Sequence, residues 1–525
     1  MMKNNIKYLA ILALGLVACE PEFDNPIEDA GTYSSGEADF STYVALGNSL
    51  TAGFADGALY ITGQENSYPN ILSKQFAFAG GGDFTQPLMD DNTGGLLIPG
   101  TDPLSNRLVL AFDAQGNPGP KPFAGAAPTT SVANVLTGPF NNMGVPGARV
   151  YHLVSAAAGY GNIAGLATGQ ANPYFVRFAS SPTAAIIDDA VAQNPTFFSL
   201  WIGNNDILGY ATSGGVGEDH NVTGNLMAGT YSGDDITNNM VFAGAYNELV
   251  TKLAAGGTKG VLLNLPDVTS IPFFTTVPNN ALVLDAATAA SLTGFFQAVT
   301  GIVTAQVAGT GVPLAQAQAL ASQYAITFSA GANRFLIKTE VTPTNPLGFR
   351  QMTEQELLLL TIDRGALAQG YGSVMLTPEV LQVLGILQAG GTPTAAQGAM
   401  VIAAISAIDD KDALDSGELD AISTARTSFN ATIAGLAAAN NLALYDAASD
   451  LAQVADGGIA INGGVVTSQF VTGGGFSLDG VHPSPRGHAI VTNGILEAIK
   501  ETYGVNLPAV DPSDFGTITL SNEVN

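Results

Sequence analysis

Four short apolar runs, each stopped by a strand-breaking residue, constrain the fold most. They are residues 42–46, 196–202, 260–265 and 442–445. Helical patterns precede the last three runs, at residues 184–193, 243–255 and 421–439. Continuous apolar strands that alternate with helices predict a parallel sheet with helices on both faces. We therefore expect an α/β fold in which ligands lie beyond the carboxyl ends of the strands.

Two motifs at opposite ends of the chain carry the chemistry. Gly47-Asn48-Ser49 follows the first strand and opens a helix, which places a serine hydroxyl and its own backbone N–H where an oxyanion could form. Asp479 stands three residues before His482, so its carboxylate can hold one ring nitrogen while the other faces a serine. The alternatives are a helix cap at the first motif and a purely structural histidine at the second.

Two further blocks lie between these motifs. They are Asn142-Met-Gly-Val-Pro-Gly147-Ala and Gly203-Asn204-Asn205-Asp206. With the first and last motifs, in this order, they resemble the SGNH hydrolases, also called GDSL lipases and esterases. The resemblance covers about residues 43–275 and 410–503. It implies a flavodoxin-like three-layer sandwich around a central parallel sheet.

The resemblance also implies a role for each site residue. Ser49 is expected to be the nucleophile, His482 its base, and Asp479 the acid that orients the imidazole. The backbone N–H groups of Ser49 and Gly147 and the side chain of Asn205 are expected to form the oxyanion hole. No metal and no other cofactor is implied.

The function implied is that of a serine esterase or lipase that hydrolyses carboxylic (acyl) esters of a small molecule or a lipid. Carbohydrate O-deacetylation on the same fold is the first alternative. The second is a non-catalytic outer-membrane binding lipoprotein, because the family usually has Asp where this chain has Asn48. The natural ester, its acyl length and the oligomeric state are left open by the sequence.

Residues 275–409 depart from the strand–helix alternation. Within them, residues 286–333 and 380–408 contain no charged side chain. We expect a largely helical insertion, which either covers the site as a lid with an apolar inner face or forms a second core. A membrane-spanning helix is a weaker alternative, because Thr, Gln and Gly interrupt the apolar stretches.

The hydrolase core is then expected in two parts, residues 41–274 and 410–505, followed by a C-terminal tail at 506–525. Within the first part, residues 79–140 are rich in Gly, Pro, Asn and Asp. We expect this segment to be a long surface excursion with a small hairpin at residues 107–119.

The N-terminus is typical of a bacterial lipoprotein. Lys3 and Lys7 form a positive segment before a short apolar run that ends in Leu16-Val17-Ala18-Cys19. This ending resembles a lipobox, which implies a signal peptide at 1–18, acylation of Cys19, and an anchor in the outer membrane of Bacteroidetes-type bacteria, on the periplasmic or cell-surface side. The polar residues 19–40 predict a flexible tether. An ordinary signal peptide with an incidental cysteine is the alternative.

The net charge of the chain limits the class of partner, and the remaining acidic residues and histidines bear on whether there is a further site. The net charge of −27 excludes nucleic acid as a partner, because such a surface repels phosphate backbones. The acidic residues of 409–418 lack the spacing of an EF-hand loop, so we expect a solvated helix start there. His152, His220 and His488 lack a setting like that of the last motif and are expected to be structural.

Overall fold

The computed structural model describes residues 33–112, 116–155 and 159–520. Its centre is a five-stranded sheet in the order β15-β6-β5-β1-β4, in which every neighbouring pair is parallel. The strands are β1 (Tyr43–Gly47), β4 (Asn142–Gly144), β5 (Phe197–Trp201), β6 (Lys259–Leu263) and β15 (Ala443–Tyr445). Four of these strands were predicted, whereas β4 lies inside the second block and was not expected as a strand.

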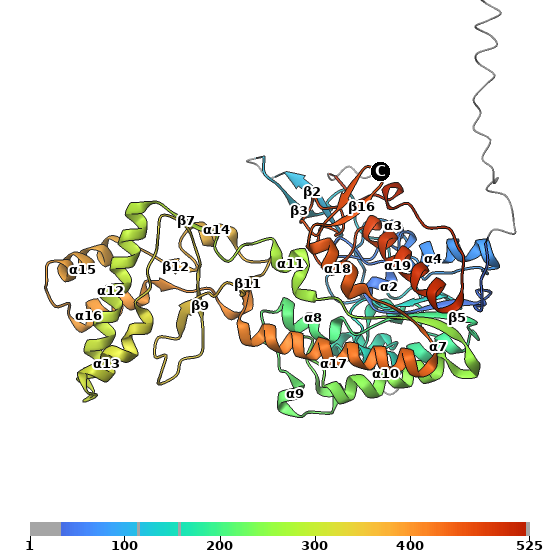
Figure 1. The fold of residues 1–525 in the computed structure, drawn as a ribbon, viewed down its shortest axis with the longest axis horizontal. Coiled ribbons are helices and arrows are strands. Elements are labelled where there is room, and N and C mark those ends of the chain that lie inside the picture. Colours follow the sequence, from blue (N-terminus) through green and yellow to red (C-terminus); the bar gives the residue numbers. More distant parts are fainter. Residues whose placement is uncertain (1–32, 113–115, 156–158, 521–525) are drawn as a thin grey trace, which may run out of the picture.

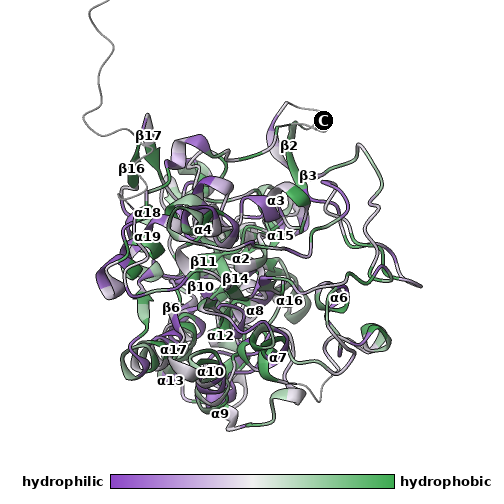
Figure 2. Ribbon diagram, turned by 90° about the vertical axis from the view of Figure 1, so that its right-hand side faces the viewer, coloured by the Kyte–Doolittle hydropathy of each residue, from purple (hydrophilic) through white to green (hydrophobic). Residues whose placement is uncertain are grey.

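Both faces of the sheet are covered by helices, as Figures 1 and 2 show. On one face, Leu46 and Leu200 pack in the core formed with α5 (Val150–Val154), α7 (Ile186–Val191), α10 (Asn239–Leu253) and α17 (Ser416–Asn440). On the other face, Phe197 and Val261 pack against α4 (Tyr68–Phe76) and α19 (Pro485–Tyr503). Alternate strand residues therefore serve opposite cores, and the predicted α/β class with three layers is confirmed.

Shorter helices and two hairpins lie in the connections between the strands and the long helices. These helices are α2 (Ser49–Ala52), α3 (Ile61–Glu65), α6 (Pro173–Val176), α8 (Asn205–Thr212), α9 (His220–Thr223), α11 (Pro272–Thr275) and α18 (Ala447–Ala455). Two antiparallel hairpins, β2–β3 (Leu108–Phe112 and Pro118–Pro122) and β16–β17 (Ile459–Ile461 and Gly464–Val466), project on the same side of the domain (Figure 1). The first is the hairpin expected at residues 107–119.

The insertion forms a separate lobe beside the sheet domain, at the left of Figure 1. Its helices are α12 (Ala286–Gly309), α13 (Leu314–Ala321), α14 (Arg364–Ala368), α15 (Pro378–Gln388) and α16 (Ala395–Ala403). Short strands pair antiparallel between them, namely β7 (Leu282–Leu284), β8 (Gly331–Asn333), β9 (Leu336–Lys338), β10 (Phe349–Gln351), β12 (Ser373–Val374) and β13 (Ile405–Ser406). A further pair, β11 (Leu357–Leu358) with β14 (Ala413–Leu414), joins the lobe to the start of α17.

The apolar residues of this lobe form their own hydrophobic core. Phe295, Phe296 and Val299 of α12 are completely buried in it, beside Tyr324 and Phe349. Among the described residues, α12 is the one helix long and apolar enough to cross a membrane, a property that core helices of soluble proteins share. Its buried side chains pack within the lobe, which favours the second-core interpretation of the insertion.

Both ends of the described chain pack on the core. Ser34 pairs with Asn506, and the ring of Phe40 stacks on Phe76 with centroids 3.8 Å apart. The prediction of a flexible tether is therefore wrong for residues 34–40, because apolar side chains such as Phe40 are buried. The signal peptide, Cys19 and the rest of the expected tether lie outside the described residues. In the tail, Leu520 bridges to Leu110 of β2.

Candidate active site

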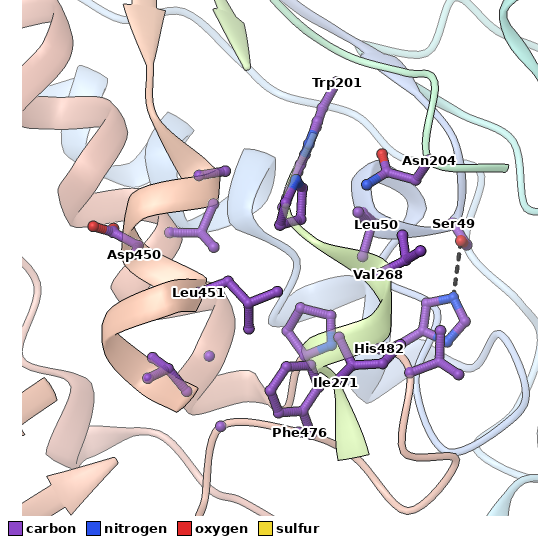
Figure 3. A pocket seen from close by; sticks show the side chains of 18 of the residues that line it. Ser49, Leu50, Trp201, Asn204, Val268, Ile271, Asp450, Leu451, Phe476 and His482 are labelled. Carbon is purple, nitrogen blue, oxygen red and sulfur yellow. Dashed lines mark hydrogen bonds between the residues drawn. The ribbon is translucent and has the colours of Figure 1, made fainter. Parts of the chain in front are cut away.

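The serine and histidine motifs meet although 433 residues separate them. The Oγ of Ser49 lies 2.8 Å from Nε2 of His482 (Figure 3). The other ring nitrogen, Nδ1, lies 2.9 Å from Oδ2 of Asp479. The structure thus brings together the three residues predicted as a catalytic triad, with the hydrogen-bonding order that general-base activation of a serine requires.

Local structure at the end of β1 fixes the position of Ser49. The strand ends at Gly47, and α2 begins directly at Ser49, 6% exposed. The side-chain oxygen of Asn48 accepts a hydrogen bond from the Leu50 N–H at 3.0 Å and thereby caps the helix. The Asn48 amide also donates to Oδ1 of Asn204 at 3.4 Å. A carboxylate could not donate in this way, so the contact with Asn204 depends on the amide of Asn48.

Asp479 is held by donors on both of its oxygens. Oδ1 accepts from the backbone N–H groups of Val481 and His482 at 2.9 and 2.8 Å. Oδ2 accepts from the Gly57 N–H at 2.9 Å. Burial alone would raise the pKa of Asp479, but the charge of His482 and these hydrogen bonds outweigh it and lower the pKa to about 2. The carboxylate is therefore ionised throughout the neutral range and stabilises a protonated imidazole.

The three predicted oxyanion donors lie at the carboxyl ends of neighbouring strands β1, β4 and β5. Gly147 has a φ of +79°, which suits glycine, and lies in the turn that follows β4. The Nδ2 of Asn205 donates to the carbonyl of Ala148 at 2.9 Å, so this side chain lies against the residue after Gly147. Within the described part of the chain, the backbone N–H groups of Ser49 and Gly147 make no hydrogen bond. Both remain available to an oxyanion.

Two buried charged residues, Asp206 and Arg149, support this edge, and their role was not predicted from the sequence. Asp206, completely buried, accepts from the Val150 N–H at 3.0 Å and so ties α8 to the start of α5. Burial raises the pKa of Asp206 to about 6, although the nearby charge of Arg149 lowers it. Arg149, 3% exposed, donates to the carbonyl of Gly233. The sequence signal was the Asp that ends the Gly203–Asp206 block.

A largely apolar pocket adjoins Ser49 and His482, with a cavity volume of about 110 Å³ (Figure 3). Its apolar walls come from the loop after β6, from α18 and from the loop of residues 475–483, including Val268, Leu451 and Phe476. Asn205 also lines it, whereas no residue of 275–409 does. The apolar surface at the site is therefore supplied by the sheet domain itself, and the insertion does not cover the pocket in this structure.

Of the other histidines, His220 and His488 are buried and His152 is half-buried, and one of the three differs from the prediction. His220 does have a carboxylate partner, because its Nε2 lies 2.9 Å from Oδ2 of Asp235. Its Nδ1 is occupied by Thr223 at 2.9 Å, so this pair ties together the loop after α8. Burial lowers the pKa values of His152 and His488 to about 3, which keeps both rings neutral. All three have structural contacts.

The acidic residues near 409–418 contribute to the start of α17. Asp415 caps the helix by accepting from the Glu418 N–H at 3.0 Å, and the Glu418 side chain accepts from the Asp415 N–H at 2.6 Å. Burial raises the pKa of Glu418 to about 8. In residues 33–112, 116–155 and 159–520, no three His, Cys, Asp or Glu side chains form a group that could hold a metal ion.

Comparisons of the chain with family models, with curated proteins and with solved structures found no match. The assignment of a function therefore rests on the geometry of the Ser49 site and on the residues that line its pocket.

Proposed function

We propose that this chain is a serine esterase of the SGNH kind that hydrolyses carboxylic esters with an apolar acyl chain. One observation carries the proposal: Ser49, His482 and Asp479 form a continuous hydrogen-bonded array beside a pocket that Asn205 also lines. Three groups in series, next to candidate oxyanion donors, are the parts that acyl transfer requires.

The first half of the reaction forms an acyl-enzyme. His482 Nε2 takes the proton of the Ser49 hydroxyl as Oγ attacks the ester carbonyl carbon. The carbonyl oxygen becomes an oxyanion, which the N–H groups of Ser49 and Gly147 and the Asn205 amide receive. The carbon–oxygen bond to the alcohol then breaks, and the leaving alkoxide takes the proton from His482 Nε2.

Water reverses these steps in the second half. His482 Nε2 removes a proton from water as the water oxygen attacks the acyl carbon. The bond to Ser49 Oγ breaks, and Oγ regains a proton from His482. Asp479 stays ionised throughout and stabilises each transient imidazolium, as the pKa of about 2 of its carboxyl requires. This half of the reaction releases the carboxylic acid and restores the hydroxyl of Ser49.

The pocket supports an acyl chain as the group recognised. Leu451, Val268 and Phe476 offer an apolar surface, and each buried methylene contributes about 0.8 kcal/mol, or about 4-fold in affinity. An O-deacetylase needs room for one methyl group and polar contacts to a sugar. The apolar lining thus favours a longer acyl group over acetyl.

A chain-length series tests the proposal. On p-nitrophenyl esters we expect kcat/KM to rise from acetate to hexanoate by about 4-fold per methylene. Leu451→Trp fills the pocket and is expected to abolish this gain while leaving acetate hydrolysis unchanged. Leu444→Trp is the matched control, because Leu444 is exposed and does not line the pocket. Activity on acetate alone in the wild-type protein would favour the deacetylase, and no activity on any ester would contradict the proposal.

Removal of one oxyanion donor is a separate prediction. We expect Asn205→Ala to lower kcat by about 10²- to 10³-fold with little change in KM, since the amide acts on charge that develops only in the transition state. Steady-state kinetics on the preferred ester measure this effect. Asn70→Ala in α4 is the control, because its side chain donates to the backbone carbonyl of Glu65 and does not line the pocket. An equal fall in kcat in both variants would contradict the proposal that Asn205 is an oxyanion donor.

A further inference from the structure

A second buried carboxylate, Asp56, lies behind the triad acid. It follows α2, is 3% exposed and has a φ of +54°, which a residue other than glycine rarely adopts. Its Oδ1 accepts from the Leu478 N–H at 2.8 Å, and its Oδ2 accepts from the Tyr60 hydroxyl at 2.7 Å. Its own N–H donates to the Ser477 Oγ at 2.9 Å. Asp56 thus holds the two residues that precede Asp479.

The contacts continue directly to the triad. The next residue, Gly57, donates its N–H to Oδ2 of Asp479, the oxygen that also contacts His482. The Ser477 hydroxyl, which accepts from Asp56, donates to the other oxygen of Asp479 at 3.0 Å. Residues 56–57 therefore support both oxygens of the triad acid, across more than 420 positions in the sequence.

The titratable and charged groups that influence Asp56 come from three places in the chain. Asp56 faces Tyr60 just before α3, Arg107 before β2, and Asp479. The Arg107 guanidinium lies 4.8 Å from the centre of the Tyr60 ring. The pKa of Asp56 lies above its ordinary value, because burial and the charge of Asp479 outweigh the hydrogen bonds from Leu478 and Tyr60 and the charge of Arg107. Both of its oxygens accept hydrogen bonds, which suits an ionised carboxylate.

On the imidazole side, His482 faces Asp479 and Ser49, and His488 of α19 lies close enough to interact electrostatically. His488 is neutral near pH 7, because burial lowers its pKa to about 3. On the Nδ1 side of His482, the carboxylates are therefore Asp479, which contacts the ring, and Asp56, which lies beyond Asp479.

We propose that Asp56 is a positioning residue that holds the 477–479 turn under His482 and whose negative charge stabilises the protonated imidazole. Its effect on turnover rests on the proposed esterase function, whereas its effect on the imidazole does not. Asp56→Asn keeps the shape and the acceptor for Leu478 but removes the charge. Asp56→Ala removes both.

The test combines kinetics with an NMR titration of His482. For Asp56→Asn we expect the imidazole pKa, and the acidic limb of kcat/KM, to fall by roughly 1 pH unit, because the imidazolium loses a nearby negative charge. For Asp56→Ala we expect the same shift and a further loss of roughly 10- to 100-fold in kcat/KM from misplacement of the triad. The asparagine variant therefore restores the rate at high pH but not the position of the acidic limb.

Asp235→Asn is the matched control. It also removes a buried carboxylate from a histidine, and it should alter the titration of His220 but not that of His482. If the Asp56 variants do not fold, Tyr60→Phe removes one donor from Asp56, raises its pKa, and should produce a smaller fall in the imidazole pKa. An unchanged His482 titration in a folded variant overturns the role of Asp56. The NMR experiment needs no substrate, so a wild-type protein without esterase activity overturns the proposed function alone.

Discussion

Ser49→Ala is expected to lower kcat by about 10⁶-fold on any ester that the wild-type protein hydrolyses. The reason is that Ser49 Oγ, 2.8 Å from His482 Nε2, is the one atom proposed to form a bond to the substrate. His482→Ala should lose about as much, and the double variant should lose little more, because nucleophile and base act as a unit. Steady-state kinetics of the three variants measure this.

Ser213→Ala is a suitable control for the loss of a serine hydroxyl. Ser213 follows α8, its hydroxyl donates to the Tyr210 carbonyl, and it does not line the pocket, so the Ser213→Ala protein should turn over at the wild-type rate. Thermal unfolding should show that all variants are folded. A folded Ser49→Ala protein with wild-type turnover would mean that another nucleophile does the chemistry.

Asp479→Asn is expected to lower kcat by about 10⁴-fold. The carboxylate fixes the tautomer in which Nδ1 carries the proton and Nε2 faces Ser49, and an amide in its place can donate to Nδ1 and reverse this tautomer. The loss should appear in kcat more than in KM, because Asp479 does not line the pocket. A loss of less than 10-fold would mean that His482 is oriented by other contacts.

The same substitution has a signature in stability. The pKa of Asp479 is about 2 in the folded protein, below the unfolded value near 4, so ionisation of this carboxyl stabilises the fold at neutral pH. This contribution is present above about pH 4 and is lost as pH falls toward 2. The melting temperature of the wild-type protein should therefore fall more steeply over this window than that of Asp479→Asn. Parallel curves would contradict the low pKa.

Periodicity and strand-breaking residues predicted the sheet well but not completely. The runs that became β1, β5, β6 and β15 are mostly apolar, because β1 and β5 are buried on both faces and β6 is buried after Lys259. β4 is only Asn142–Gly144, with one apolar side chain, and its pairing with β1 depends on the assembled sheet. The end of the tether was misplaced for a similar reason, since Ala38 and Phe40 are buried within a segment that is otherwise polar in sequence.

In the site, the residues that touch the chemistry were easier to predict than those that support them. Ser49 and His482 stand in recognisable motifs with a serine after a strand and an acid near a histidine. Asp56 stands in no motif, and its partners, Leu478 and Ser477, lie more than 420 residues away in the sequence. The pocket was likewise unforeseen, because its walls combine segments such as Val268 and Leu451 that only the fold brings together.

Covalent labelling with an alkyl fluorophosphonate tests the central claim most directly, since the probe reacts with a serine only where a base and an oxyanion hole activate it. Mass spectrometry of the labelled, digested protein should show one adduct, on the peptide that contains Ser49. The adduct should be absent from Ser49→Ala and strongly reduced in His482→Ala. A folded wild-type protein that remains unlabelled, or that labels equally after Ser49→Ala, would contradict the proposal that Ser49 is an activated nucleophile.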